Sequence, residues 1–264
     1  RQELIRGFFT LGPAVERLEQ AWARYCGVKH AVGVNSGTDA LIIAMKALGI
    51  GPGDEVITCP NTFVATVGAI VAVGATPRFV DAGDDYLIDV SAASRVITQQ
   101  TRAIIPVDLT GRPAYCPPIH GWRAFSLDGV LPCPIIRDAC QSIGATYNGV
   151  SSAKVSEIAA YSLHPLKNVH ACGDGGMIVT DNDEWAEWIR LYRNHGLKDR
   201  DTVVLPGINS RLDTLQAIAG WHILQDVEAI TVKRNQNAAQ YRAGLEAIEQ
   251  ITLAPLDTLG TQVR

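Results

Sequence analysis

The strongest chemical signal in the sequence is a lysine in an apolar, proline-bearing loop. Lys167 lies in residues 162–168 (SLHPLKN), and a glycine-rich turn at residues 173–176 (GDGG) follows closely. An amine in such a loop can form a Schiff base with a carbonyl compound, as lysines do with pyridoxal phosphate (PLP), and can later move protons. Most lysines are simply solvated, so Lys167 indicates a cofactor only together with partners elsewhere in the chain.

A carboxylate that could serve as such a partner ends an apolar run at residues 135–137. Asp138 would then lie at the carboxyl end of a strand, where side chains of open α/β sheets face the ligand crevice. In a PLP enzyme, an acid beside the pyridine nitrogen keeps that nitrogen protonated, so the ring can accept electrons from the substrate. An aspartate that caps a following helix explains this segment equally well.

A turn of small polar residues precedes a predicted helix. Residues 35–39 (NSGTD) follow a short apolar run, and N–H groups at a helix start bind anions such as phosphate. Gly37 permits close backbone approach, and the Thr38 hydroxyl can add a hydrogen bond. Taken alone, a plain N-cap by Ser36 or Thr38 explains the turn more simply. The turn, the acid and the lysine nevertheless occur in the order that a PLP-binding fold requires.

Alternating strand and helix patterns would position these groups. Such alternation, punctuated by Gly and Pro, predicts an α/β fold with a mostly parallel sheet flanked by helices. We expect strands at residues 31–34, 55–58, 76–80, 103–107, 135–137, 159–162 and 176–180, and helices at residues 15–25, 39–48, 63–73, 185–194, 214–228 and 233–248. Residues 112–134 are rich in Pro and Gly and are expected to form an irregular connection.

The composition excludes several classes of partner. A net charge of −4 without a basic run gives no sign of nucleic acid or of an anionic membrane surface as partner. The longest apolar stretch, around residues 64–73, is too short to span a bilayer. The six cysteines form no CxxC pair and no zinc-type cluster with histidine. We therefore expect no metal site, and reduced thiols in a cytoplasmic protein.

Nine segments, dense and in order, resemble the PLP-dependent sugar aminotransferases of the DegT–StrS type, within the fold-type I aspartate aminotransferase superfamily. They are residues 36–41 (SGTDAL), 51–58 (GPGDEVIT), 60–66 (PNTFVAT), 74–81 (GATPRFVD), 138–145 (DACQSIGA), 162–168 (SLHPLKN), 173–176 (GDGG), 193–196 (RNHG) and 207–216 (GINSRLDTLQ). The resemblance implies a seven-stranded-type sheet in a PLP-binding large domain at residues 1–230. Residues 231–264 would begin a C-terminal small domain that is largely absent from this chain.

The resemblance also assigns roles to individual residues. Lys167 would carry the PLP, and Asp138 would pair with the pyridine nitrogen. Gln141 would contact the cofactor's hydroxyl, and Phe63, which alone would suggest a core residue, would lie against the ring face. The expected phosphate ligands are Gly37, Thr38 and Ser162.

Three further residues have weaker support. Asn209 would reach the phosphate of a neighbouring subunit, although without the resemblance it is a simple turn residue. His164 could touch substrate, but a structural histidine is the simpler interpretation. His195, in RNHG, belongs to a family motif whose role the sequence does not indicate.

The implied activity is transamination in sugar biosynthesis. A homodimer would transfer an amino group, with L-glutamate as the expected donor, to a keto sugar linked to a nucleotide. A PLP-dependent sugar dehydratase is the alternative among enzymes, but dehydrating relatives carry histidine where this chain has Lys167. An inactive or regulatory relative is the alternative outside enzymes.

Overall fold

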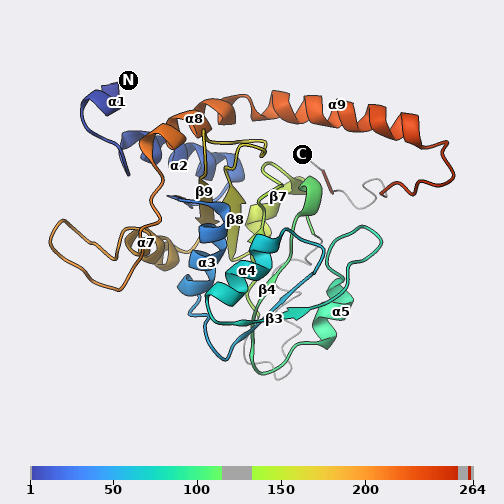
Figure 1. Ribbon diagram of the computed structural model, residues 1–264, viewed down its shortest axis with the longest axis horizontal. Helices are drawn as coiled ribbons and strands as arrows, with labels where there is room; N and C mark the ends of the chain where they lie inside the picture. Colours follow the sequence, from blue (N-terminus) through green and yellow to red (C-terminus); the bar gives the residue numbers. More distant parts are fainter. Residues whose placement is uncertain (1, 115–132, 255–260, 263–264) are drawn as a thin grey trace.

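The structure is a computed structural model, and it describes residues 2–114, 133–254 and 261–262 (Figure 1). The expected irregular connection at residues 112–134 lies mostly outside the described residues. No helix within the described ranges is long and apolar enough to cross a membrane.

Seven strands of the described chain form a continuous central sheet. Their spatial order is β1 (His30–Val34), β9 (Gly176–Thr180), β8 (Ile158–Ser162), β5 (Ile136–Asp138), β4 (Thr101–Ile105), β2 (Glu55–Thr58) and β3 (Thr76–Phe79). Parallel bridges from Ile104 to Ile135 and from Val107 to Asp138 join the β4 and β5 edges. Strand β9 is antiparallel to both its neighbours, whereas the other pairings are parallel. The predicted mostly parallel α/β sheet is confirmed.

Apart from its partly exposed edge strand β3, the sheet is buried on both faces because alternate residues of its strands enter different cores. On β8, Ala159 and Tyr161 pack with helices α2 (Pro13–Cys26) and α8 (Thr214–Gln225). Ile158 and Ala160 pack on the other face, with α3 (Gly37–Ala47), α4 (Val64–Ala72) and α7 (Asp183–Tyr192). Such double burial explains why the strands read as apolar runs rather than as alternating patterns.

The sequence patterns did not predict several short helices and strands. Helix α5 (Val90–Arg95) is capped by Asp89, whose side chain accepts a hydrogen bond from the Ala92 N–H. Its Ala93 packs in one core with Ile57 of β2 and Ile104 of β4. Other short elements are helix α1 (Gln2–Ile5), the 3₁₀ turns η1 (Leu109–Gly111) and η3 (Ser152–Val155), and the small sheet of β6 (Thr146–Tyr147), β7 (Val150–Ser151) and β10 (Thr261–Gln262). They carry too few residues to show a periodicity.

The last long helix differs from its predicted bounds. Helix α9 (Val227–Leu245) follows α8 almost directly, whereas we expected a helix at residues 233–248. It runs along one side of the molecule and extends past the sheet (Figure 1). Only its first turns, at Val227 and Thr231, are buried. The predicted domain boundary at residue 230 falls inside this helix and stays a prediction.

Candidate active site

The phosphate-type turn lies against the end of strand β8. A Cβ atom placed on Gly37 would lie 2.7 Å from Ser162 Cβ and 3.1 Å from Cys140 Sγ, so only glycine permits this approach. Ser36 caps α3, because its hydroxyl accepts a hydrogen bond from the Asp39 N–H at 3.0 Å. The cap leaves the N–H groups of Gly37 and Thr38 outside the helix ladder. The turn is therefore both a capped helix start and a site suited to an anion.

Asp138 is a buried acid whose hydrogen-bond donors are neutral groups. Its side chain is 5% exposed, Oδ2 accepts a hydrogen bond from the Thr66 hydroxyl at 2.7 Å, and Oδ1 accepts one from the Cys140 N–H at 3.2 Å. Burial raises the pKa of Asp138, and the Thr66 hydrogen bond opposes that shift. A cationic N–H facing this carboxyl would stabilise its charged form. The next elements after Asp138 in the described chain are the short strands β6 and β7, not a helix. The interpretation of Asp138 as the cap of a following helix is therefore wrong.

Lys167 lies in a loop closed by backbone hydrogen bonds. The Leu163 N–H donates to the Gly175 carbonyl and the Lys167 N–H to the His164 carbonyl, both at 2.8 Å. Burial raises the pKa of the Cys140 thiol well above its usual range, and the Lys167 charge partly opposes this. Lys167 and Cys140, which lies in the turn after Asp138, line the same cavity.

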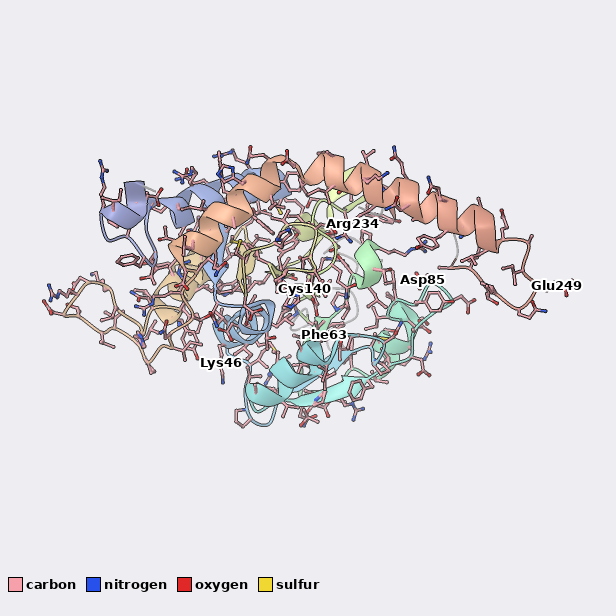
Figure 2. The ribbon with its side chains drawn as sticks, turned by 45° about the horizontal axis from the view of Figure 1, so that its top comes forward. Lys46, Phe63, Asp85, Cys140, Arg234 and Glu249 are labelled. Atoms are coloured by element: carbon pink, nitrogen blue, oxygen red, sulfur yellow. The ribbon has the colours of Figure 1, made fainter. Side chains whose placement is uncertain are left out.

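Two adjoining cavities meet at Lys167. The first, the phosphate-turn cavity, has a volume of about 360 Å³, and all the predicted site residues except Asn209 line it. The second, the α9 cavity, has a volume of about 400 Å³ and is lined on one side by α9. Both share Cys140, Gln141, Ser162, Leu166 and Lys167. In Figure 2, Cys140 lies between Phe63 on one side and Arg234 of α9 on the other.

Phe63 and Gln141 occupy different walls of the phosphate-turn cavity. Phe63 precedes α4 and is 66% exposed, so the interpretation as a core residue is wrong. Gln141 Oε1 accepts a hydrogen bond from the Thr110 N–H at 2.9 Å. Since its carbonyl oxygen is held in this way, the NH₂ end of Gln141 is the group left to donate to a ligand oxygen.

Asn209 does not line the cavity of its own chain. It is exposed and pairs with Asn194 in an isolated antiparallel bridge. Its neighbour Ser210 is fully buried, and the Ser210 hydroxyl donates to Asp39 Oδ2 at 2.7 Å and accepts from the Asn35 N–H at 3.2 Å. The segment is thereby tied to the phosphate turn. Sequence reasoning missed Ser210, because a single serine in a loop carries no pattern.

The RNHG motif, residues 193–196, makes structural contacts next to the segment that carries Asn209 and Ser210. Arg193 is buried and binds both the Glu19 carboxylate and the Gly33 carbonyl, so it joins α7, α2 and β1. Gly196 adopts φ +73°, and a Cβ there would overlap the Leu205 carbonyl. The His195 N–H donates to the Ile208 carbonyl at 2.9 Å. These contacts give the motif a structural role that sequence alone did not indicate.

A buried ion pair supports the turn that carries Gln141. Asp108 and Arg137 have fully buried side chains joined by an Arg137 Nη1–Asp108 Oδ1 contact of 2.6 Å. The Ser142 hydroxyl donates to Asp108 Oδ2 at 2.7 Å, and the Asp108 N–H donates to the Asp138 carbonyl at 3.0 Å. Sequence reasoning missed Asp108, since nothing in the pattern around it predicts burial.

His164 is exposed beside the lysine loop. Its Nδ1 accepts a hydrogen bond from the Leu166 N–H at 3.3 Å, and the residue lines the phosphate-turn cavity.

Among the described residues, no cluster of His, Cys, Asp or Glu has the geometry of a metal site.

Comparison with known proteins identifies the family. The sequence profile of the DegT/DnrJ/EryC1/StrS aminotransferase family matches residues 1–262. The chain belongs to this family. One family relative is a Streptomyces venezuelae protein named dTDP-3-amino-3,4,6-trideoxy-alpha-D-glucose transaminase, 40% identical over 95% of this chain and 65% of its own length. Another is a Geobacillus stearothermophilus protein named pleiotropic regulatory protein, 41% identical over 96% of this chain and 67% of its own length.

Solved structures of the family have the same fold. The crystal structure of S. venezuelae DesV in complex with a ketimine intermediate superposes with a TM-score of 0.91, at 38% identity, over 99% of this chain and 69% of that one. A Bacillus subtilis structure titled ntda with bound cofactor pmp gives a TM-score of 0.87, at 33% identity, over 100% of this chain and 61% of that one. The chain spans about two thirds of the length of the relatives that it matches.

Proposed function

We propose that this chain binds PLP and transfers an amino group, with L-glutamate as donor, to a keto sugar linked to a nucleotide. The observation that carries the proposal is the convergence of three groups on one cavity: the Gly37–Thr38 turn, Asp138 and Lys167. Each group suits one part of the cofactor. The N–H groups of Gly37 and Thr38, which the cap at Ser36 leaves outside the helix ladder, suit a phosphate, and the buried acid suits a protonated ring nitrogen.

Different side chains of the phosphate-turn cavity would bind the cofactor and transfer protons. PLP, when bound, supplies an electron sink for a carbanion. Asp138 would hold a proton on the ring nitrogen, and the NH₂ group of Gln141 would donate to the ring hydroxyl oxygen. Lys167 Nζ attaches the cofactor and, once released, moves the proton at the donor's α-carbon as general base and acid. Phe63 offers a flat surface for the ring.

The homodimer is part of the proposal. Asn209 is exposed, lies outside its own cavity and is held to the phosphate turn through Ser210. A symmetric dimer would let each Asn209 contribute an amide donor to the partner's phosphate and would build both sites at once. The described cysteines are free thiols, which favours a cytoplasmic location.

Two other functions keep some support. A sugar dehydratase would share the cofactor site, but Lys167 stands where dehydrating members of the family carry histidine. A regulatory role without catalysis has one specific observation in its favour, the name of the Geobacillus stearothermophilus relative. The retained lysine, acid and turn favour the enzyme.

The decisive experiment is cofactor loading of the purified chain. We expect a yellow chromophore that borohydride fixes, and peptide mapping should then place the pyridoxyl group on Lys167. Lys154 and Lys198, which line neither cavity, serve as internal controls. Label on either control residue would contradict the Lys167 assignment, and a colourless chain would favour the regulatory alternative.

A further inference from the structure

The α9 cavity shares Lys167 and Gln141 with the proposed cofactor site, but most of the residues that line it do not line the phosphate-turn cavity. It has a volume of about 400 Å³ and lies between the lysine loop and helix α9. Trp22 and Tyr161, which pack edge to face at 5.5 Å, line it from the sheet side, and Arg234 and Ala238 line it from α9. Its volume is in the range of small-molecule sites.

The residues that line both cavities include the two that would bind the reacting part of PLP. In PLP, the carbon that bonds to amines is attached next to the ring carbon that carries the hydroxyl. Lys167, which would bond to that carbon, and Gln141, which would face that hydroxyl, line both cavities. An amine that displaces Lys167 can therefore extend into the α9 cavity, which Ser162 borders but Gly37 and Thr38 do not line. This step rests on the proposed function.

The α9 cavity combines a cation with apolar walls. Arg234 and Lys167 are its charged lining residues, and no carboxylate lines it among the described residues. Arg234 is exposed, and no ion pair within the described ranges involves it. Ile143 and Val169 contribute aliphatic surface to the same space. The matching ligand carries an anion at one end and methylene groups behind it.

We propose that the α9 cavity binds the side-chain carboxylate of a dicarboxylic amino donor, with Arg234 as its cationic partner. A guanidinium presents donors in a planar fork that fits a carboxylate. The donor's methylene groups would lie along Ile143 and Val169 while its amine reaches Lys167. Arg234 is then the residue that distinguishes an acidic donor from a neutral one.

The test compares L-glutamate with L-glutamine, which has nearly the same shape without the charge. The PLP-loaded chain is mixed with each amino acid, and the loss of its visible chromophore is followed in a single turnover. For Arg234→Gln we expect the second-order rate constant with L-glutamate to fall about tenfold, the effect of one solvent-accessible charge-assisted contact. The rate constant with L-glutamine should not change, and Arg234→Lys should lie between the two.

Lys233→Gln is the matched control. It removes one positive charge from the adjacent position of the same exposed helix, outside both cavities, and should behave as wild type. An equal loss with both amino acids in Arg234→Gln would overturn the proposal, because Arg234 would then contact a group that the two donors share. Unchanged rate constants with L-glutamate would overturn it as well.

A binding measurement separates this proposal from the proposed function. Glutarate, a dicarboxylate without an amine, is titrated calorimetrically into wild type, Arg234→Gln and Lys233→Gln. We expect about tenfold weaker binding only in Arg234→Gln. Equal glutarate affinity in the three proteins would refute the carboxylate site even if the chain is an active transaminase. Failure of the chain to form a chromophore with PLP would instead refute the cofactor proposal, and the glutarate titration would still decide on Arg234.

Discussion

The contact between the phosphate turn and strand β8 allows a quantitative test at Gly37. The variant Gly37→Ala adds one methyl group that would lie 2.7 Å from Ser162 Cβ and 3.1 Å from Cys140 Sγ. Neither neighbour is the end of a long flexible side chain, so helix α3 or the end of β8 must shift. Overpacking of this kind costs about 1–3 kcal/mol of unfolding free energy. The melting temperature should fall by roughly 2–4 °C per kcal/mol in a chain of this size.

A second glycine in a helix provides the matched control. Gly68 lies on the exposed face of α4, and a Cβ there would have no atom within 4 Å. Gly68→Ala should therefore stabilise the protein by about 0.5–1 kcal/mol, since alanine favours the helix. Chemical denaturation of both variants measures the two effects in the same protein.

A double variant tests whether the cost at Gly37 comes from the predicted contact. Ser162→Gly removes the atom nearest to the added methyl group. In Gly37→Ala/Ser162→Gly we expect a favourable coupling of about 1 kcal/mol or more relative to the sum of the single changes. PLP affinity should fall in Gly37→Ala, because the N–H groups of the turn move away from the phosphate. A Gly37→Ala protein as stable as wild type, with unchanged PLP affinity, would refute the reasoning.

Three further changes probe other parts of the site. Asp138→Asn should lower turnover by more than about 10²-fold, the usual contribution of one proton-transfer group, while a retained melting transition shows that the fold is intact; near wild-type turnover would contradict this. Asp108→Asn should lower the unfolding free energy by about 3–5 kcal/mol in denaturant titrations, because it leaves the Arg137 charge buried without its carboxylate; a loss under 1 kcal/mol would argue against the pair. Mixing Lys167→Ala with Asn209→Ala chains should partly restore activity, since each hybrid dimer keeps one intact site. Confirmed hybrids without any rescue would place Asn209 outside the partner's site.

Local pattern in the sequence was enough to predict the architecture and most of the residues that line the phosphate-turn cavity as candidates for the site. Strands β2 and β9 lie where the apolar runs predict them, because a strand buried on both faces leaves a continuous apolar signal. The loop of Lys167 follows β8, Asp138 is the last residue of β5, and the turn before α3 follows β1, so all three stand at strand ends. The carboxyl ends of parallel strands meet at one edge of a sheet, so these residues converge once the fold is known.

Only the tertiary structure decided which residues support these groups and which spaces surround them. Ser210 meets Asp39, and Arg193 meets Glu19, across more than 170 positions of the chain, and no local pattern encodes such pairings. Nor does the sequence around Arg234 show that one turn of an exposed helix borders the cavity at Lys167. Periodicity reports which face of an element is buried. Contacts between distant segments depend on how whole elements pack, and that is a property of the folded chain.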